Sequence, residues 1–313
     1  MDNFQKALEI NCKEEEERII KFIKRSLVEL NREGAVIGLS GGLCSSTCAY
    51  LLEKALDKDK ILALILPERD NSPVNMEHAR LVAKNLGLKT KEINITDVLE
   101  KIGVYEVGPE EIKSEKDLAK LKKMDVIARK IISPYVISDS LTLIHGGKPS
   151  TKFSIVEKLT GKNIHGKTAF SLTKVRIRMV YLYFHAWLNK YAVMGTTDKT
   201  EYTMGMYDVH GDGANDITPL RHLYKTQIRK LAEYIGVPRE ITEKPSSGDL
   251  YGNVSNEETF GITYEKLDRL FYGIERGCSE EELLEIVPKE ALNRFKRCIE
   301  TANMGRSLPL SLS

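Results

Sequence analysis

Residues 40–46 have the types and spacing of a phosphate-binding loop. In the sequence SGGLCSS, Gly41 and Gly42 stand between the hydroxyl of Ser40 and those of Ser45 and Ser46. Glycine lets the backbone approach a ligand closely, and the N–H groups at the start of a helix attract phosphate. A plain turn with a helix cap uses the same residue types, so the loop must be judged with the elements around it.

The elements expected on either side of this loop are a buried strand and a helix. Residues 35–39 form a short apolar run, and residues 45–56 continue with helical periodicity. Further strands are expected at 61–67, 89–95 and 191–194, and further helices at 13–32, 76–86, 171–190, 225–235, 263–274, 279–286 and 288–302. Strands that alternate with helices predict an α/β fold with a parallel sheet.

The composition agrees with a cytoplasmic enzyme of this class. The 313 residues are 42% hydrophobic and 29% charged, and the formal net charge is only +2, which does not point to nucleic acid or a membrane as the main partner. The apolar runs are far shorter than the roughly 20 residues of a membrane span. Five cysteines without a Cys-x-x-Cys pair suit a reducing compartment better than a disulfide scaffold.

The loop is similar to the SGGxDS[ST] loop of the ATP pyrophosphatase superfamily, and in particular to that of ammonia-dependent NAD synthetases. Other segments resemble that family in the same order along the chain: LPERDNSP, VRIRM, GTTDKTEY, GDGANDITPL, LYKTQIRKLAEYIGVP, EKPSSGDL and GITYEKLDRLFYGIERG. The resemblance implies an adenine-nucleotide alpha-hydrolase-like parallel sheet flanked by helices, with C-terminal helices. We expect one such domain over residues 1–313, with an expanded segment near residues 100–170.

The resemblance also implies an activity. Enzymes of this family transfer AMP from ATP to a carboxylate, release pyrophosphate, and let ammonia displace AMP to form an amide; here the acid would be deamido-NAD. ATP and Mg²⁺ are the expected cofactors, and a homodimer is the expected assembly. No glutaminase-like segment precedes the loop in this sequence, so we expect ammonia to come from solution or from a separate glutaminase subunit.

Positions that match the family motifs supply the expected site residues. The pyrophosphate would lie against Ser40, Gly41, Gly42, Ser45 and Ser46. Further contacts to ATP are expected from Thr196, Lys225 and Ser247, an Mg²⁺ ligand from Glu201, and contacts to the acid substrate from Arg176 and Asp216. Ser40, Ser45, Ser46 and Lys225 are the expected catalytic residues. Without the motif context, Lys225 and Glu201 would be ordinary helix-surface charges.

The sequence departs from the family pattern where metal and acid substrate are expected. Cys44 replaces the loop aspartate that helps to hold Mg²⁺, and Mg²⁺ prefers oxygen ligands to sulfur. Its position beside a helix N-terminus would lower the thiol pKa and leaves a nucleophilic role open. Val209 replaces a lysine, and Met304-Gly305-Arg306 keeps only the arginine of a His-Lys-Arg motif. Because of these losses, the sequence supports the reaction class better than it supports deamido-NAD as the acid substrate.

Two alternatives therefore remain beside NAD synthetase: a ligase that amidates another carboxylic acid, and a weakened paralogue that only binds nucleotide. A separate segment, residues 161–168 (GKNIHGKT), matches the Walker A pattern. The residues before it, KFSIVEKLT, have helical rather than strand spacing, and a Walker loop needs a strand there. We expect no nucleotide site at this segment.

Overall fold

The computed structural model describes residues 2–108, 123, 127, 130–135, 137–160, 164–247 and 255–308. The central element is a parallel four-stranded sheet with the order β3-β2-β1-β4. Its strands are β1 (Gly34–Gly38), β2 (Ile61–Ile65), β3 (Lys89–Glu92) and β4 (Tyr191–Met194). In the register, Val36 lies beside Leu62 on one side and beside Val193 on the other. The predicted parallel α/β sheet is confirmed.

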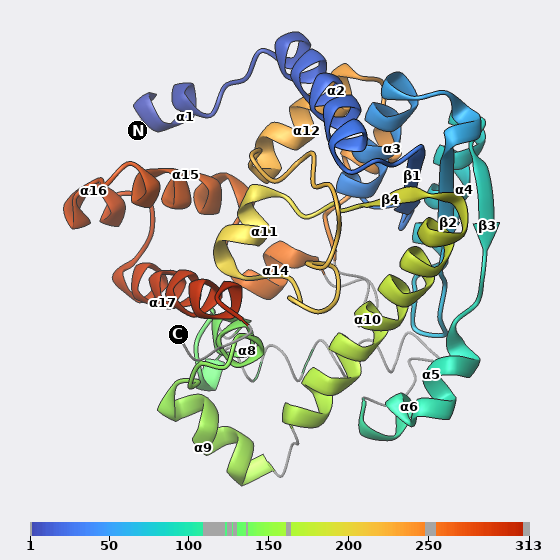
Figure 1. Ribbon diagram of the computed structural model, residues 1–313. Coiled ribbons are helices and arrows are strands. Elements are labelled where there is room, and N and C mark those ends of the chain that lie inside the picture. Colours follow the sequence, from blue (N-terminus) through green and yellow to red (C-terminus); the bar gives the residue numbers. More distant parts are fainter. Residues whose placement is uncertain are drawn as a thin grey trace, which may run out of the picture.

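Two layers of helices cover the sheet (Figure 1). One face packs on α2 (Cys12–Glu29), α3 (Leu43–Ala55), α4 (Pro73–Leu86) and α12 (Lys225–Tyr234). The other face packs on α5 (Thr96–Ile102), α6 (Val104–Val107) and the long α10 (Ile164–Asn189). Alternate residues of β1 divide between the two layers: Ala35 and Ile37 join the first core, and Val36 joins the second.

A third core lies beside the sheet and is built mainly by the C-terminal helices (Figure 1). They include α15 (Tyr264–Glu275), α16 (Glu280–Leu284) and α17 (Lys289–Arg306), which confirm the predicted C-terminal helices. The other described elements are α1 (Asp2–Ala7), the short 3₁₀ helix η1 (Lys58–Lys60), α8 (Ile137–Ile144), α9 (Thr151–Thr160), α11 (Lys199–Met204), α13 (Arg239–Thr242) and α14 (Asn256–Phe260).

Two helices begin earlier than their apolar spacing predicts. Helix α4 starts at Pro73, because proline fits the first helical position, where no N–H partner is needed. Helix α10 starts at Ile164 and so contains residues 164–168 of the Walker-like segment. The helix α9 precedes that segment, as the spacing predicts, while residues 161–163 lie outside the described part. The expanded segment near residues 100–170 also lies partly outside it.

Among the described residues, no helix combines the length and the apolar character needed to cross a membrane.

Candidate active site

A cavity of about 400 Å³ lies where β1 and β4 end. The strand order reverses between these two neighbouring strands, because β2 and β3 lie on one side of β1 and β4 lies on the other. Ligands of open α/β sheets bind at this switch point, outside the carboxyl ends of the strands. Its walls include six of the residues expected from the sequence to contact ATP: Ser40, Gly42, Ser45, Thr196, Lys225 and Ser247.

The loop after β1 is already ordered by its own hydroxyls. The Oγ atoms of Ser40 and Ser45 share a hydrogen bond of 2.9 Å, the backbone N–H of Ser40 donates to Ser45 Oγ at 3.3 Å, and that of Gly42 donates to Ser40 Oγ at 3.3 Å. Helix α3 begins within this segment at Leu43, so Ser45 and Ser46 lie in its first turn. The hydroxyls and the helix N-terminus thus converge on one side of the cavity, as a phosphate site requires.

Gly41 fits this loop for a steric reason. Its φ is +72°, and a Cβ at this position would overlap the carbonyl oxygen of Asn75 in the first turn of α4. The loop is therefore packed against α4 through a position that only glycine fills. Ser46 differs from Ser45. Its side chain is fully buried, and its hydroxyl has no hydrogen-bond partner among the residues that the structure describes.

Lys225 is held at the centre of a buried cluster of polar groups. Its Nζ lies 2.5 Å from Asp198 Oδ2, 2.8 Å from Glu201 Oε1 and 3.1 Å from Cys44 Sγ. Helix α11 presents the two acids, because Asp198 caps it and forms a capping box with Glu201. Lys225 is the first residue of α12. Three segments therefore build the cluster: the Ser40–Ser46 loop, α11 and α12.

Burial governs the ionisation of this cluster. It raises the pKa of Glu201 to about 7, reinforced by the charge of Asp198 and opposed by Lys225. Burial opposes the charge of Lys225, but Asp198, Cys44 and Glu201 outweigh it and hold the Lys225 pKa well above its usual value. Burial also holds the pKa of the Cys44 thiol well above its usual value. The expected lowering of this pKa by the helix N-terminus is therefore wrong, and Cys44 is a neutral thiol.

The cluster also offers ligand atoms for a divalent cation. One atom each from Cys44, Asp198 and Glu201 lie within 4.8 Å of one another. Both acids already accept hydrogen bonds on both oxygens: Asp198 from the Glu201 N–H and from Lys225, and Glu201 from the Asp198 N–H and from Lys225, so their positions relative to the cavity distinguish them. Glu201, which lines the cavity, is the carboxylate that suits Mg²⁺, whereas the sulfur of Cys44 does not.

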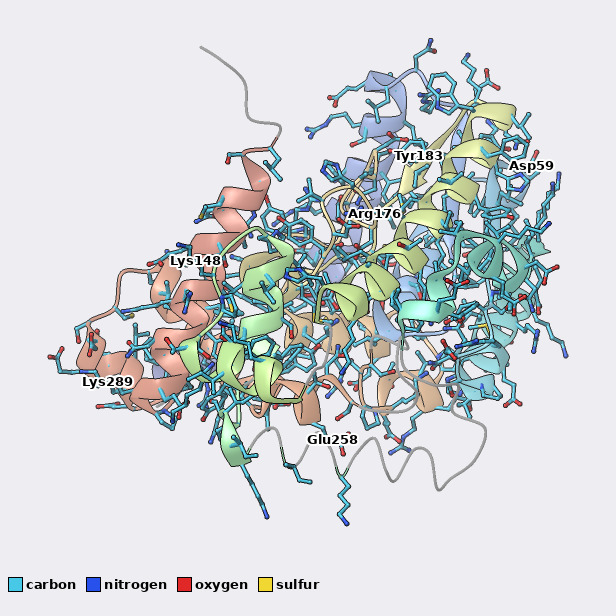
Figure 2. All side chains as sticks on the ribbon, turned by 90° about the horizontal axis from the view of Figure 1, so that it is seen from below. Asp59, Lys148, Arg176, Tyr183, Glu258 and Lys289 are labelled. Atoms are coloured by element: carbon cyan, nitrogen blue, oxygen red, sulfur yellow. The ribbon has the colours of Figure 1, made fainter. Side chains whose placement is uncertain are left out.

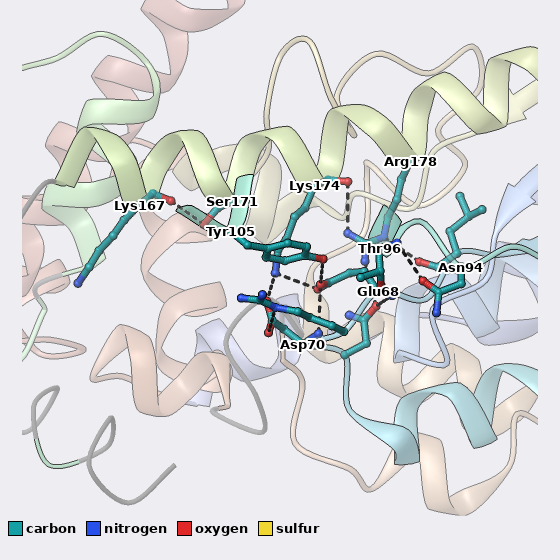
Figure 3. A network of polar contacts seen from close by, with 12 residues as sticks. Glu68, Asp70, Asn94, Thr96, Tyr105, Lys167, Ser171, Lys174 and Arg178 are labelled. Atoms are coloured by element: carbon teal, nitrogen blue, oxygen red, sulfur yellow. Dashed lines mark hydrogen bonds and ion pairs between the residues drawn. The ribbon is translucent and has the colours of Figure 1, made fainter. Parts of the chain in front are cut away.

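A second polar network fixes the turn after β2 (Figure 3). Lys174 of α10 is fully buried and donates to Glu68 Oε1 at 2.9 Å and to Asp70 Oδ2 at 2.5 Å. Its ammonium lies 3.8 Å from the ring centre of Phe170, and Tyr105 donates to Glu68 Oε2 at 2.9 Å. The sequence gives no sign of this network, because its members lie up to 106 residues apart.

Arg178 connects the same turn to the cavity. It donates to the carbonyl of Leu66 at 3.3 Å and to Asn71 Oδ1 at 3.0 Å, and all three residues line the cavity. Here the cavity wall is mostly apolar, with Leu64, Leu66, Met76, Met179 and Leu182. An apolar wall with a few fixed amide and guanidinium groups suits a planar base, while the wall formed by the Ser40–Ser46 loop suits phosphates.

The segment after α13 closes the phosphate end of the cavity. Lys244, Ser246 and Ser247 all line it, and Lys244 donates to the carbonyl of Gly41 at 3.2 Å. The prediction included Ser247 but missed Lys244, although both belong to the EKPSSGDL motif. The contact with Gly41 spans 203 residues and leaves no spacing pattern in the sequence.

Two of the expected acid-substrate residues lie outside this cavity. Arg176 forms an ion pair with Asp208, with N–O distances of 2.6 and 3.1 Å, and Asp216 accepts from Tyr183 and from the Val193 N–H. Figure 2 shows Arg176 and Tyr183 on α10. Arg176 lines a second, open hollow along this helix. The structure therefore does not bring these residues together with the ATP positions.

Arg306, the residue of the C-terminal motif that this sequence keeps, bonds to and packs against other residues of the protein. It donates to the carbonyl of Tyr202 and, at 3.1 Å, to the hydroxyl of Tyr207, and its guanidinium lies 4.0 Å from the ring centre of Tyr202. Arg306 therefore joins α17 to α11 and is absent from the cavity wall.

Comparison with known proteins agrees with this architecture. A family model described as NAD synthase matches residues 15–148 and 148–309. The chain is 37% identical to an NH(3)-dependent NAD(+) synthetase of Methanocaldococcus jannaschii, covering 93% of both chains. It is also 37% identical to one of Thermotoga maritima, covering 94% of this chain and 98% of that one.

Solved structures share the fold over nearly the whole chain. An NMN synthetase from Francisella tularensis superposes with a TM-score of 0.69 at 25% identity, covering 97% of this chain and 100% of that one. An NH3-dependent NAD synthetase from Campylobacter jejuni does so with a TM-score of 0.64 at 21% identity, covering 97% and 100%. With the family model and the relatives in agreement over most of its length, this chain belongs to the NAD synthase family.

Proposed function

We propose that this protein is an ATP-dependent ligase that adenylates a carboxylate and forms an amide with ammonia, acting as an ammonia-dependent NAD synthetase on deamido-NAD. The observation that carries the proposal is the 37% identity, over more than nine-tenths of the chain, to relatives named for this activity. The cavity at the strand ends supports it, because its walls combine a phosphate loop with an apolar surface.

In the proposed reaction, a carboxylate oxygen of the acid attacks the α-phosphorus of ATP. The bond to the bridging oxygen breaks, and pyrophosphate leaves with the electron pair. The acyl-adenylate then reacts with ammonia, which displaces AMP and loses a proton to give the amide. Adenylation is needed because a carboxylate itself has no good leaving group.

We assign the leaving pyrophosphate to the loop. Ser40, Gly41, Gly42 and Ser45 would donate backbone and hydroxyl groups to it, with Ser46 supporting the start of α3 behind them. Donors that are fixed before the reaction stabilise charge as it develops, without the cost of reorientation. The ordered hydrogen bonds between Ser40 and Ser45 support this assignment.

Lys225, Thr196 and Ser247 complete the proposed ATP site. Lys225 would supply a fixed positive charge beside the loop, and its buried ion pairs keep it protonated. Glu201 would hold Mg²⁺ together with phosphate oxygens and water. The metal, when bound, neutralises charge on the phosphates.

The test of this function is product analysis with the purified protein. Incubation with Mg²⁺, ATP, ammonium and deamido-NAD should yield NAD, AMP and pyrophosphate in equal amounts. Formation of ADP and phosphate, or no amide from deamido-NAD or from any other acid tested, would contradict the proposal.

A second candidate substrate follows from the solved NMN synthetase. At a TM-score of 0.69 and 25% identity, this structure supports amidation of the smaller mononucleotide acid, deamido-NMN. Val209 and Met304-Gly305, which replace polar family residues, favour the same alternative. Comparing kcat/KM for the two acids decides between them. We propose that deamido-NAD is preferred, because relatives 36–37% identical over more than nine-tenths of the chain are named NH(3)-dependent NAD(+) synthetases.

We also propose a homodimer, a single functional domain over residues 1–313, and a cytoplasmic location. The dimer is supported by an exposed apolar face on α10, where Val180, Phe184, Trp187 and Leu188 are 58–69% exposed. Their spacing puts them on one side of the helix. Arg176 and Asp216 would then contact the acid substrate near this face. The cytoplasmic location is supported by five cysteines without disulfides.

A further inference from the structure

The charges around the phosphate loop leave a need for another cation. Lys225 carries one positive charge, but Asp198 and Glu201 contact it directly. The side chains of this cluster therefore do not add net positive charge. Pyrophosphate carries several negative charges, and backbone N–H groups supply only partial charges to meet them. A second ammonium group at the loop would change this balance.

Lys244 supplies an ammonium group at the rim of the loop. Its Nζ lies 3.2 Å from the carbonyl oxygen of Gly41, 2.5 Å from Asn75 Oδ1 and 3.1 Å from His78 Nδ1. Gly41 is the residue between Ser40 and Gly42, which both line the cavity. The Lys244 ammonium thus directly contacts the loop that would bind pyrophosphate.

The segment that carries Lys244 belongs to the cavity wall. Lys244, Ser246 and Ser247 line the cavity together, and Asn75 lines it as well. The hydroxyl oxygen of Ser246 is buried and has no hydrogen-bond partner within the described residues. A buried hydroxyl of this kind is normally satisfied by a protein group, water or ligand. The cavity side of this segment therefore carries both a cation and a hydroxyl donor.

We propose that Lys244 is a further pyrophosphate-binding residue, which turns from the Gly41 carbonyl to the phosphate oxygens when the loop is filled. The identity of the ligand as pyrophosphate rests on the proposed function, whereas the position of Lys244 at the loop does not depend on it. A lysine binds phosphate as a point charge and needs no fixed orientation, so a small rotation of its flexible side chain suffices. Asn75 and His78 hold the ammonium at the loop until then.

The test is equilibrium binding of pyrophosphate in the presence of Mg²⁺, measured by calorimetry without turnover. Lys244→Met should weaken pyrophosphate binding by about tenfold or more, the effect of losing one charge-assisted contact. Lys244→Arg should restore most of it. Lys84→Met, an exposed lysine of α4, is the matched control and should bind pyrophosphate as the wild type does. Adenosine affinity should stay within about twofold in every variant, because the base end of the cavity is unchanged.

A second variant separates binding from loop anchoring. His78→Ala removes one anchor of Lys244 and keeps its charge, so it should bind pyrophosphate nearly as the wild type does. If Lys244→Met binds pyrophosphate normally, or if His78→Ala weakens it equally, the inference is wrong and Lys244 only fastens the loop. Because no turnover is required, these results are independent of the product analysis that tests the proposed ligase activity.

Discussion

Ser45 lines the cavity and the hydroxyl of Ser46 is buried, so the two serines should contribute differently to catalysis. Ser45→Ala removes a fixed donor and should slow ATP–pyrophosphate exchange by about 10²-fold, the scale for losing one preorganised donor. Ser46→Ala should slow it less than about tenfold. Equal effects in two folded variants would count against the assignment of the loop.

Cys44 bears directly on the proposed Mg²⁺ site. Its neutral sulfur stands near Glu201, where an oxygen ligand suits Mg²⁺ better. Cys44→Asp should therefore lower the Mg²⁺ concentration needed for half-maximal exchange, with ATP affinity no weaker than in the wild type. Cys44→Ser, which adds no charge, is the control. Identical Mg²⁺ curves for wild type and Cys44→Asp would rule out the metal explanation.

A covalent role for Cys44 makes a different prediction. If Cys44 acts covalently, Cys44→Asp and Cys44→Ser should both abolish turnover, and alkylation should inactivate the wild type. The burial of the thiol and its raised pKa argue against that outcome.

At the scale of elements, Lys174 joins α10 to the turn after β2. It is fully buried between Glu68 and Asp70, so Lys174→Met leaves the buried Glu68 carboxylate without its cation and leaves Asp70 paired with Arg69 alone. The free energy of unfolding should fall by about 3–5 kcal/mol, as for other broken buried pairs. Urea denaturation measures this loss. Lys174→Met with Glu68→Gln and Asp70→Asn should recover part of it, and no recovery would show that the charges are not the cause.

The elements that could be predicted from the sequence are those with local signals. The strand β1 and the loop after it combine an apolar run with two glycines, and β2 and β4 are short apolar runs bounded by polar residues. Distant contacts leave no such signal. The pairing of Lys174 with Glu68, and of Lys244 with Gly41, depends on how the chain folds back on itself. The start of α10 was missed because glycine and lysine interrupt its apolar spacing.

At the scale of the whole molecule, the exposed face of α10 is the proposed contact between two copies. Trp187 is 69% exposed, and a stripe of large apolar side chains on a surface helix marks an interaction site. Trp187→Asp puts a charge into this contact and should convert the dimer to monomer. Analytical ultracentrifugation of wild type and variant tests it, with Lys158→Asp on the exposed surface of α9 as control. A monomeric wild type would contradict the proposed dimer.

The central claim is that the protein activates its acid by adenylation. ATP–pyrophosphate exchange without ammonia measures this step directly, because labelled pyrophosphate re-enters ATP only if an acyl-adenylate forms reversibly. The account predicts exchange that requires both Mg²⁺ and deamido-NAD and that stops when the acid is left out. Exchange without any acid, or amide formation accompanied by ADP and phosphate, would contradict it.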